Sequence, residues 1–223
     1  MSNTFALYER GWLGCYIEGL PTRFADLQRN ITRPGMHLVQ RFVRTKGPDS
    51  LDAILADKLP PSGLDVLSID IDSDDLAILE ALQAVRPRAI VIEFNPTIPF
   101  DTHYRNPTGK SRGNSALSIW EHAKTRGYDL VAVTHRNLVL IDQSFNAGAF
   151  KAYELHEIAH NSGYRFFFGF DGTMIRQIPA LGQQDDEDFF QVPWSRTIFP
   201  QPIARPFHRF AEGSPRVLLG GVV

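Results

Sequence analysis

The chain has 223 residues, 43% of them hydrophobic and 22% charged, a composition typical of a globular protein and unlike that of a disordered chain. A formal net charge of −2 argues against the basic surface that nucleic-acid binding requires, and no run approaches the roughly 18 apolar residues of a membrane helix. The single cysteine, Cys15, cannot form an internal disulfide, which predicts a cytoplasmic protein with Cys15 packed in its core.

Between residues 3 and 142, short apolar runs alternate with amphipathic helical patterns. Two runs, 64–71 and 89–95, are apolar on both faces, as in strands of a parallel sheet that is covered by helices on both sides. The last two runs, 130–133 and 138–141, are joined by a tight turn, which predicts an antiparallel hairpin at the end of the sheet. The sequence therefore predicts an α/β, Rossmann-like fold with three αβα layers and a mostly parallel sheet. In chain order we expect helices at 3–10, 21–31, 51–55, 74–86 and 115–126, and strands at 14–18, 38–43, 64–71, 89–95, 130–133 and 138–141.

The character of the chain changes after residue 145. A helix over 150–161 and a strand over Tyr164–Phe170 are expected there, followed by an acidic cluster and a proline-rich stretch. We interpret residues 1–145 as the main domain and 146–223 as an extension packed on it.

Three predicted strands end in acids or an amide. These residues are Glu18, then Asp70 and Asp72, then Glu93 and Asn95. Ligands of open parallel sheets bind beyond the carboxyl ends of the strands, so these side chains are the candidate site. Asp70 and Asp72 are expected on one strand face because side chains two residues apart point the same way. The next residues, Ser73, Asp74 and Asp75, are expected to cap the following helix.

Several segments in their order and spacing resemble a known family. They are Ser2-Asn3-Thr4, Leu7, Gly11–Gly14, Ile17-Glu18, Asp65–Asp72, Arg86–Arg88, Val91–Pro96, Ser115–Leu117 and Gly127–Val131. Together they resemble FkbM-type S-adenosylmethionine-dependent methyltransferases over roughly residues 2–142. The resemblance implies a methyltransferase form of the Rossmann-like sheet with S-adenosylmethionine as cofactor. Its implied contacts are Glu18 with the ribose, Asp70 near the methionine end, and Phe42 and Val43 near the adenine.

The expected activity is methylation of a hydroxyl on a saccharide or other small polar metabolite. Catalysis would come mostly from aligning the acceptor with the methyl sulfonium. Asp72, helped by Glu93 or Asn95, would orient or deprotonate the acceptor hydroxyl. The loop 96–114 is expected to close over the substrate; it carries His103, Tyr104, Arg105 and Lys110.

One part of the family pattern is not found. The family's first strand and glycine-rich loop should lie before residue 2, and that strand is central in the sheet. Without it, backbone groups on both sides of the gap would lack partners. Either the product is shortened at its N-terminus or another segment fills the gap, for which Tyr164–Phe170 is the candidate.

Three alternatives remain open. Asp70 or Asp72 with Glu93 and Asn95 offers oxygen ligands suited to Mg²⁺, which would make the methyl transfer metal-assisted. His156-Glu157-Ile158-Ala159-His160 matches the H-E-x-x-H pattern of zinc hydrolases, in which two histidines one helical turn apart hold the metal, and Glu187 is a candidate further ligand. The third alternative is a catalytically degenerate module that only binds its ligand. The acceptor and the oligomeric state are not predicted.

Overall fold

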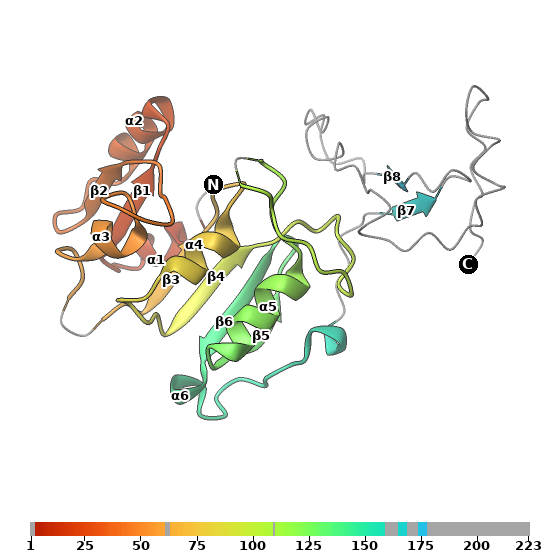
Figure 1. The fold of residues 1–223 in the computed structure, drawn as a ribbon. Helices are drawn as coiled ribbons and strands as arrows, with labels where there is room; N and C mark the ends of the chain where they lie inside the picture. The colour runs from red at the N-terminus through yellow and green to blue at the C-terminus, as the bar shows by residue number, and fades with distance from the viewer. Residues whose placement is uncertain (1–2, 61–62, 109, 159–164, 169–173, 178–223) are drawn as a thin grey trace, which may run out of the picture.

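A computed structural model describes residues 3–60, 63–108, 110–158, 165–168 and 174–177 of the chain. Helices and strands alternate through most of it, as the sequence predicts (Figure 1). The helices are α1 (Phe5–Glu9), α2 (Pro21–Asn30), α3 (Leu51–Leu55), α4 (Asp75–Ala81), α5 (Ala116–Thr125) and α6 (Gln143–Asn146), with a 3₁₀ turn η1 (Leu155–Glu157). The strands are β1 (Cys15–Glu18), β2 (His37–Gln40), β3 (Val66–Ile69), β4 (Ala89–Glu93), β5 (Tyr128–Val133), β6 (Asn137–Asp142), β7 (Arg165–Phe168) and β8 (Met174–Gln177).

Four strands form the main sheet, in the order β3-β4-β6-β5. β3 and β4 are parallel, whereas β6 runs antiparallel to both β4 and β5. The predicted antiparallel hairpin is therefore confirmed, and β6 is inserted between β4 and β5. The fold is α/β, with parallel strands and an antiparallel end.

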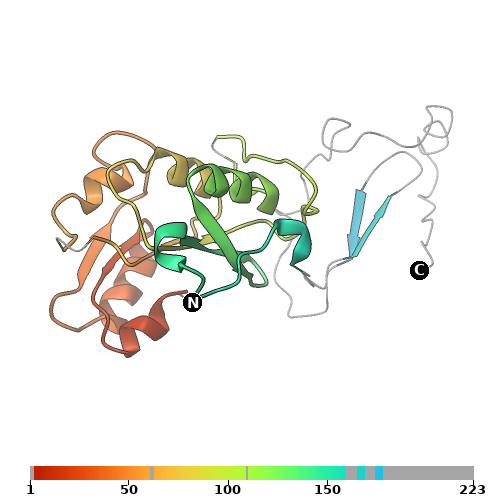
Figure 2. The same cartoon turned by 90° about the horizontal axis from the view of Figure 1, so that it is seen from below.

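The core lies between the main sheet and the helices that cover one of its faces. α4 and α5 lie side by side on this face (Figures 1 and 2). The completely buried side chains come from both layers; among them are Leu76, Ile90, Ile92, Phe94, Ile119, Leu130, Leu138 and Leu140. Ser115 caps α5 and Ser50 caps α3, because each hydroxyl accepts a hydrogen bond from a backbone N–H in the first turn.

The N-terminal unit comprises α1, β1, α2 and β2. Its two strands are parallel and in register, with Cys15 opposite His37, but they form a separate two-stranded sheet. Neither α1 nor α2 contains a buried residue, and Cys15 is half-buried. Among the described residues no strand joins β1 to β3.

The expectation that Tyr164–Phe170 fills this gap is wrong. β7, which lies in that range, pairs antiparallel with β8 in a hairpin of its own. A strand over part of the range is confirmed, but its backbone partner is local.

The predicted helix over 150–161 is also wrong for its described part, which ends at Ile158. Tyr153 is extended, and its N–H donates to the carbonyl of Leu130 in β5 at 2.9 Å. Only the short turn η1 follows. Pairing with the edge of β5 therefore holds Tyr153 in an extended conformation, although the apolar spacing alone predicts a helix there.

Candidate functional site

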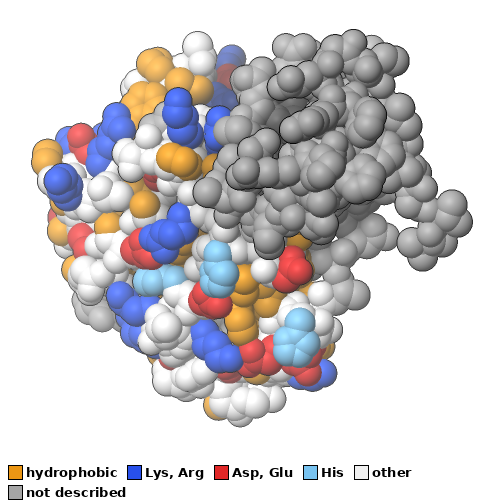
Figure 3. Space-filling model, turned by 45° about the vertical axis from the view of Figure 1, so that its right-hand side comes forward, with side chains coloured by type: hydrophobic (Ala, Val, Ile, Leu, Met, Phe, Trp, Pro, Cys, Tyr) orange, Lys and Arg blue, Asp and Glu red, His pale blue; other side chains and the backbone are white. Residues whose placement is uncertain are grey.

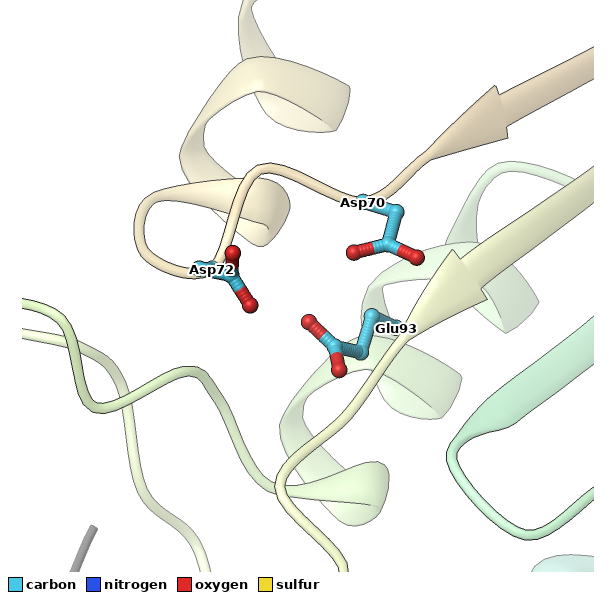
Figure 4. Close-up of side chains that lie close together, drawn as sticks. All are labelled: Asp70, Asp72 and Glu93. Atoms are coloured by element: carbon cyan, nitrogen blue, oxygen red, sulfur yellow. The ribbon is translucent and has the colours of Figure 1, made fainter. Parts of the chain in front are cut away.

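The candidate site is a cluster of three carboxylates at the carboxyl ends of β3 and β4. Ile69 is opposite Ile92 in the parallel register, so Asp70 and Glu93 follow at neighbouring positions as the two strands end. Asp72 reaches the same point from the loop between β3 and α4, and the three side chains point toward one another (Figure 4). One oxygen from each carboxylate lies within 4.8 Å of the others.

Asp70 and Asp72 meet for a different reason from the one predicted. β3 ends at Ile69, and Asp72 has a left-handed backbone conformation with φ of 58°. The turn is held by Asp75, whose carboxylate accepts hydrogen bonds from the N–H groups of Ile71 at 2.9 Å and Ser73 at 3.1 Å. The two aspartates therefore converge because the chain turns, and not because they share a strand face.

Asp75 is a residue whose role the sequence analysis missed. It was expected to cap α4, but it is the first residue of that helix and is 1% exposed. Asp74, at the N-cap position, makes no capping hydrogen bond and accepts one from Asn106 instead. A run of adjacent acids gives no signal for which of them turns inward.

The electrostatics of the cluster favour retention of a proton. Burial, together with the charges of Asp70, Asp75 and Asp72, raises the pKa of Glu93 to about 8. Burial and the Asp72 carboxylate raise the pKa of Asp70 as well. Arg136 is a nearby cation, with its Nη1 4.0 Å from Oε1 of Glu93. Like charges this close cannot all ionise near neutral pH without a cation or a proton between them.

This arrangement can do two things chemically. Glu93 can exchange a proton with a bound group near neutral pH, since its pKa lies close to that range. The cluster can also hold a hard divalent cation, because three carboxylates provide the oxygen ligands that Mg²⁺ binds. Asp70 and Asp72 are exposed and Glu93 is half-buried, so a ligand or a cation can reach the cluster from solvent.

Asn95 is not part of the carboxylate cluster. It is 3% exposed, its amide donates to the carbonyl of Arg112 at 2.8 Å, and its oxygen accepts from the N–H and hydroxyl of Thr97. These contacts fix the two ends of the loop 96–114, which gives Asn95 a structural role.

The same loop turns its polar side chains toward the helical layer. His103 Nδ1 lies 3.3 Å from Glu121 Oε2 on α5, and Arg105 pairs with Glu80 on α4. With Tyr104, whose hydroxyl is buried without a partner in the described structure, they line a surface groove of about 560 Å³. Figure 3 shows histidine, acidic and basic side chains gathered together on one face. The expectation that this loop closes over a substrate stays a prediction.

The predicted cofactor residues lie at the ends of β1 and β2. Oε1 of Glu18 accepts a hydrogen bond from the N–H of Leu20 at 2.8 Å. The Phe42 ring is 57% exposed and lies directly on Gly19, where any Cβ would come within 2.3 Å of a ring carbon. A partly exposed aromatic ring thus lies against Gly19, the residue that follows Glu18 in sequence. Val43 instead packs against the hydrophobic core.

The H-E-x-x-H motif does not lie on a continuous helix. η1 ends at Glu157, and Ile158 has the extended values φ −92° and ψ 112°. The Glu157 carboxylate accepts a hydrogen bond from the N–H of Glu154 at 2.7 Å, completing a capping box. His156 therefore lacks the helical turn that would bring a histidine four residues later beside it; His160, like Glu187, lies outside the described residues.

Comparisons with protein-family models, curated proteins and solved structures give no match to this chain. In the part of the chain that the structure describes, no helix has the length and apolar character needed to span a membrane.

Proposed function

We propose that the protein is an S-adenosylmethionine-dependent methyltransferase that acts on a hydroxyl of a small polar molecule such as a saccharide. The observation that carries the proposal is the exposed Phe42 ring, which lies on Gly19, the residue after Glu18, at the ends of the parallel strands β1 and β2. A carboxylate can accept hydrogen bonds from both ribose hydroxyls, and an exposed ring on the following residue offers a stacking surface for adenine.

The cofactor, when bound, supplies the electrophilic methyl group on its sulfonium. In this proposal Glu18 holds the ribose, Phe42 covers the adenine, and Asp70 lies near the methionine end. Asn3 donates to Asp70 Oδ2 and to Ser68 Oγ, both at 3.4 Å, and these contacts would help to hold that carboxylate in place.

The raised pKa of Glu93 changes the roles that the sequence predicts for Asp72 and Glu93. In its ionised form, a carboxylate whose pKa is raised to about 8 is a stronger base than an ordinary one and can accept a proton from an acceptor hydroxyl as the methyl transfers, whereas Asp72 is better suited to orient that hydroxyl. The cluster's oxygens also fit Mg²⁺, which would take the place of the retained proton and polarise the same hydroxyl.

The proposal is tested by calorimetric titration of the full chain with S-adenosylhomocysteine. We expect saturable binding that Glu18→Gln weakens by about tenfold or more, because a charge-assisted hydrogen bond contributes roughly 1.5–3 kcal/mol. Phe42→Ala should weaken it as well. Glu9→Gln, at an exposed position of α1, is the matched control and should bind as the native chain does.

Two results would count against the proposal. If a chain that unfolds cooperatively on heating binds no S-adenosylhomocysteine, the cofactor assignment fails. If Glu18→Gln binds as tightly as Glu9→Gln, the binding takes place elsewhere. Binding of the cofactor without methyl transfer to any saccharide would favour the degenerate binding module over the enzyme.

A further inference from the structure

The surface groove of about 560 Å³ has no part in the proposed methyl transfer. His103, Tyr104 and Arg105 line it from the loop after β4, Glu80 lines it from α4, and His122 is one of the residues that line it from α5. Every residue of the lining has a side chain that can donate or accept a hydrogen bond. Small-molecule sites have volumes of about 300–1,000 Å³, so the groove is large enough for a small polar ligand.

The groove is separate from the carboxylate cluster. The cluster lies before the N-terminus of α4, whereas Glu80 is near the C-terminal end of this helix. Glu80 follows Asp74, the N-cap residue, by six positions, which is about 9 Å along a helix. A ligand in the groove therefore need not touch the cluster.

The charged groups of the groove are paired with one another. Arg105 forms an ion pair with Glu80, and Oε1 of the same carboxylate lies 3.7 Å from Nδ1 of His122. Oε2 of Glu121 lies 3.3 Å from Nδ1 of His103. Burial lowers the pKa of His122, so this imidazole is neutral near pH 7. An ionic ligand has to break one of these pairs, whereas a neutral ligand leaves them in place.

Hydrogen-bonding capacity remains on the same side chains. Because the Nδ1 atoms of His103 and His122 face carboxylates, the Nε2 atom of each ring is left for another partner. A carboxylate has further lone pairs, and the Arg105 guanidinium has further N–H groups. In the part of the chain that the structure describes, the hydroxyl of Tyr104 is buried and has no partner. Burying a hydroxyl without a hydrogen bond is costly, and this cost indicates that a ligand supplies the missing partner.

These features select a neutral ligand with several hydroxyls. A hydroxyl both donates and accepts, so adjacent hydroxyls can donate to a glutamate while they accept from Arg105 or a histidine. We infer that the groove binds a neutral saccharide through adjacent hydroxyls, with Glu80 and Glu121 as acceptors and Arg105 as a donor. On binding, Tyr104 turns its hydroxyl toward the sugar and gains a partner. Neither the cofactor nor the carboxylate cluster takes part in this binding, which is therefore independent of methyl transfer.

The test is a ligand-observed NMR titration of the full chain with glucose, galactose, mannose, maltose and cellobiose. We expect at least one of these sugars to bind with a dissociation constant on the order of 1 mM, as suits a few hydrogen bonds in an open groove. Glucose 6-phosphate and glucosamine, which add a negative and a positive charge to the same ring, should bind more weakly than glucose.

Two variants remove hydrogen-bonding groups from the groove. Tyr104→Phe removes only the hydroxyl, and Glu121→Gln removes only the charge of an exposed carboxylate. We expect each to weaken binding of the tightest sugar by about fivefold or more. The matched controls are Tyr8→Phe and Glu9→Gln in α1, outside the groove, which should bind as the native chain does. Without sugar, Tyr104→Phe should melt no lower than the native chain, because it loses a hydroxyl that has no partner.

Four results would overturn the inference. They are absence of binding of all five sugars to a chain that melts cooperatively, tighter binding of either charged sugar than of glucose, unchanged affinity in both groove variants, and a lower melting temperature of Tyr104→Phe with unchanged affinity. The last result would give Tyr104 a structural role. Titration with S-adenosylhomocysteine is a separate measurement, so failure of saccharide binding and failure of the cofactor assignment are distinguishable.

Discussion

The main sheet and the N-terminal unit follow the same strand–helix alternation but differ in what covers them. Ile92, in the middle of the main sheet, is fully buried between Ile69 and Leu138 on its neighbouring strands. Ile17, in β1, is half-buried, and within the described part of the chain its strand pairs only with β2. A periodic apolar pattern is therefore enough to form a strand, but the strand's stability comes from the layers around it.

The largest expected difference between the two regions is the cost of truncating these isoleucines. We expect Ile92→Ala to lower the free energy of unfolding by about 3–4 kcal/mol, because a fully buried side chain loses its transfer energy and leaves a cavity. Ile17→Ala should cost about 1 kcal/mol or less. Urea unfolding followed by circular dichroism measures both. Equal losses would contradict the comparison and would show that the N-terminal unit is covered by residues beyond those described.

An ion pair in each region provides the second comparison. Arg86 pairs with Asp142, which is 2% exposed, and its guanidinium stacks over the ring of Tyr128 at 4.9 Å. We expect Arg86→Ala to cost about 2 kcal/mol, because it leaves a buried carboxylate without its partner. Arg29 and Asp26 on α2 are both exposed, so Arg29→Ala should change the stability by less than about 0.5 kcal/mol.

The control for this pair is Arg86→Lys, which keeps the positive charge but not the planar stacking group. It should retain part of the stability, since a lysine still neutralises Asp142. If Arg86→Ala were as mild as Arg29→Ala, the carboxylate of Asp142 would have to be satisfied by Ser144 alone, whose N–H and hydroxyl donate to it at 2.8 and 2.7 Å.

The sequence predicts the buried strands of the main sheet better than it predicts the loops and turns around them. The strands at 64–71 and 89–95 were recognisable because both of their faces are apolar, and their ends placed Asp70 beside Glu93 through the parallel register. Periodicity failed where a distant partner decides the conformation, as when Tyr153 pairs with β5. It also gave the wrong reason for Asp72, because the turn depends on the buried carboxylate of Asp75.

The roles of polar side chains were the hardest to predict. Asn95 follows a strand in sequence just as Asp70 does, yet its amide is used within the loop. Phe42 was named through the family resemblance alone, and only the structure shows that its ring lies on Gly19. Such contacts depend on loop geometry, for which a single sequence carries no periodic signal.

The smallest expected difference compares two glutamates that end strands, Glu93 in the main sheet and Glu18 in the N-terminal unit. The pKa of Glu93 in the folded chain is about 8, raised from 4.5 mainly by burial and then by the nearby aspartates. Between these two values the folded state holds a proton that the unfolded state has lost. This contribution to stability is therefore complete below about pH 4.5 and is lost as the pH rises through 8.

Glu93→Gln removes the titration and keeps the shape of the protonated side chain. We expect the variant to match the native chain at pH 5 and to be more stable by about 1–2 kcal/mol at pH 9, because the native chain then carries a third negative charge beside Asp70 and Asp72. Glu18→Gln should cost less than about 1 kcal/mol at both pH values, since its bond to Leu20 is exposed to solvent. Urea titrations at pH 5, 7 and 9 distinguish the two. Parallel stability profiles for native and Glu93→Gln chains would show that the three carboxylates do not share a proton, and would remove the argument for Glu93 as the proton acceptor.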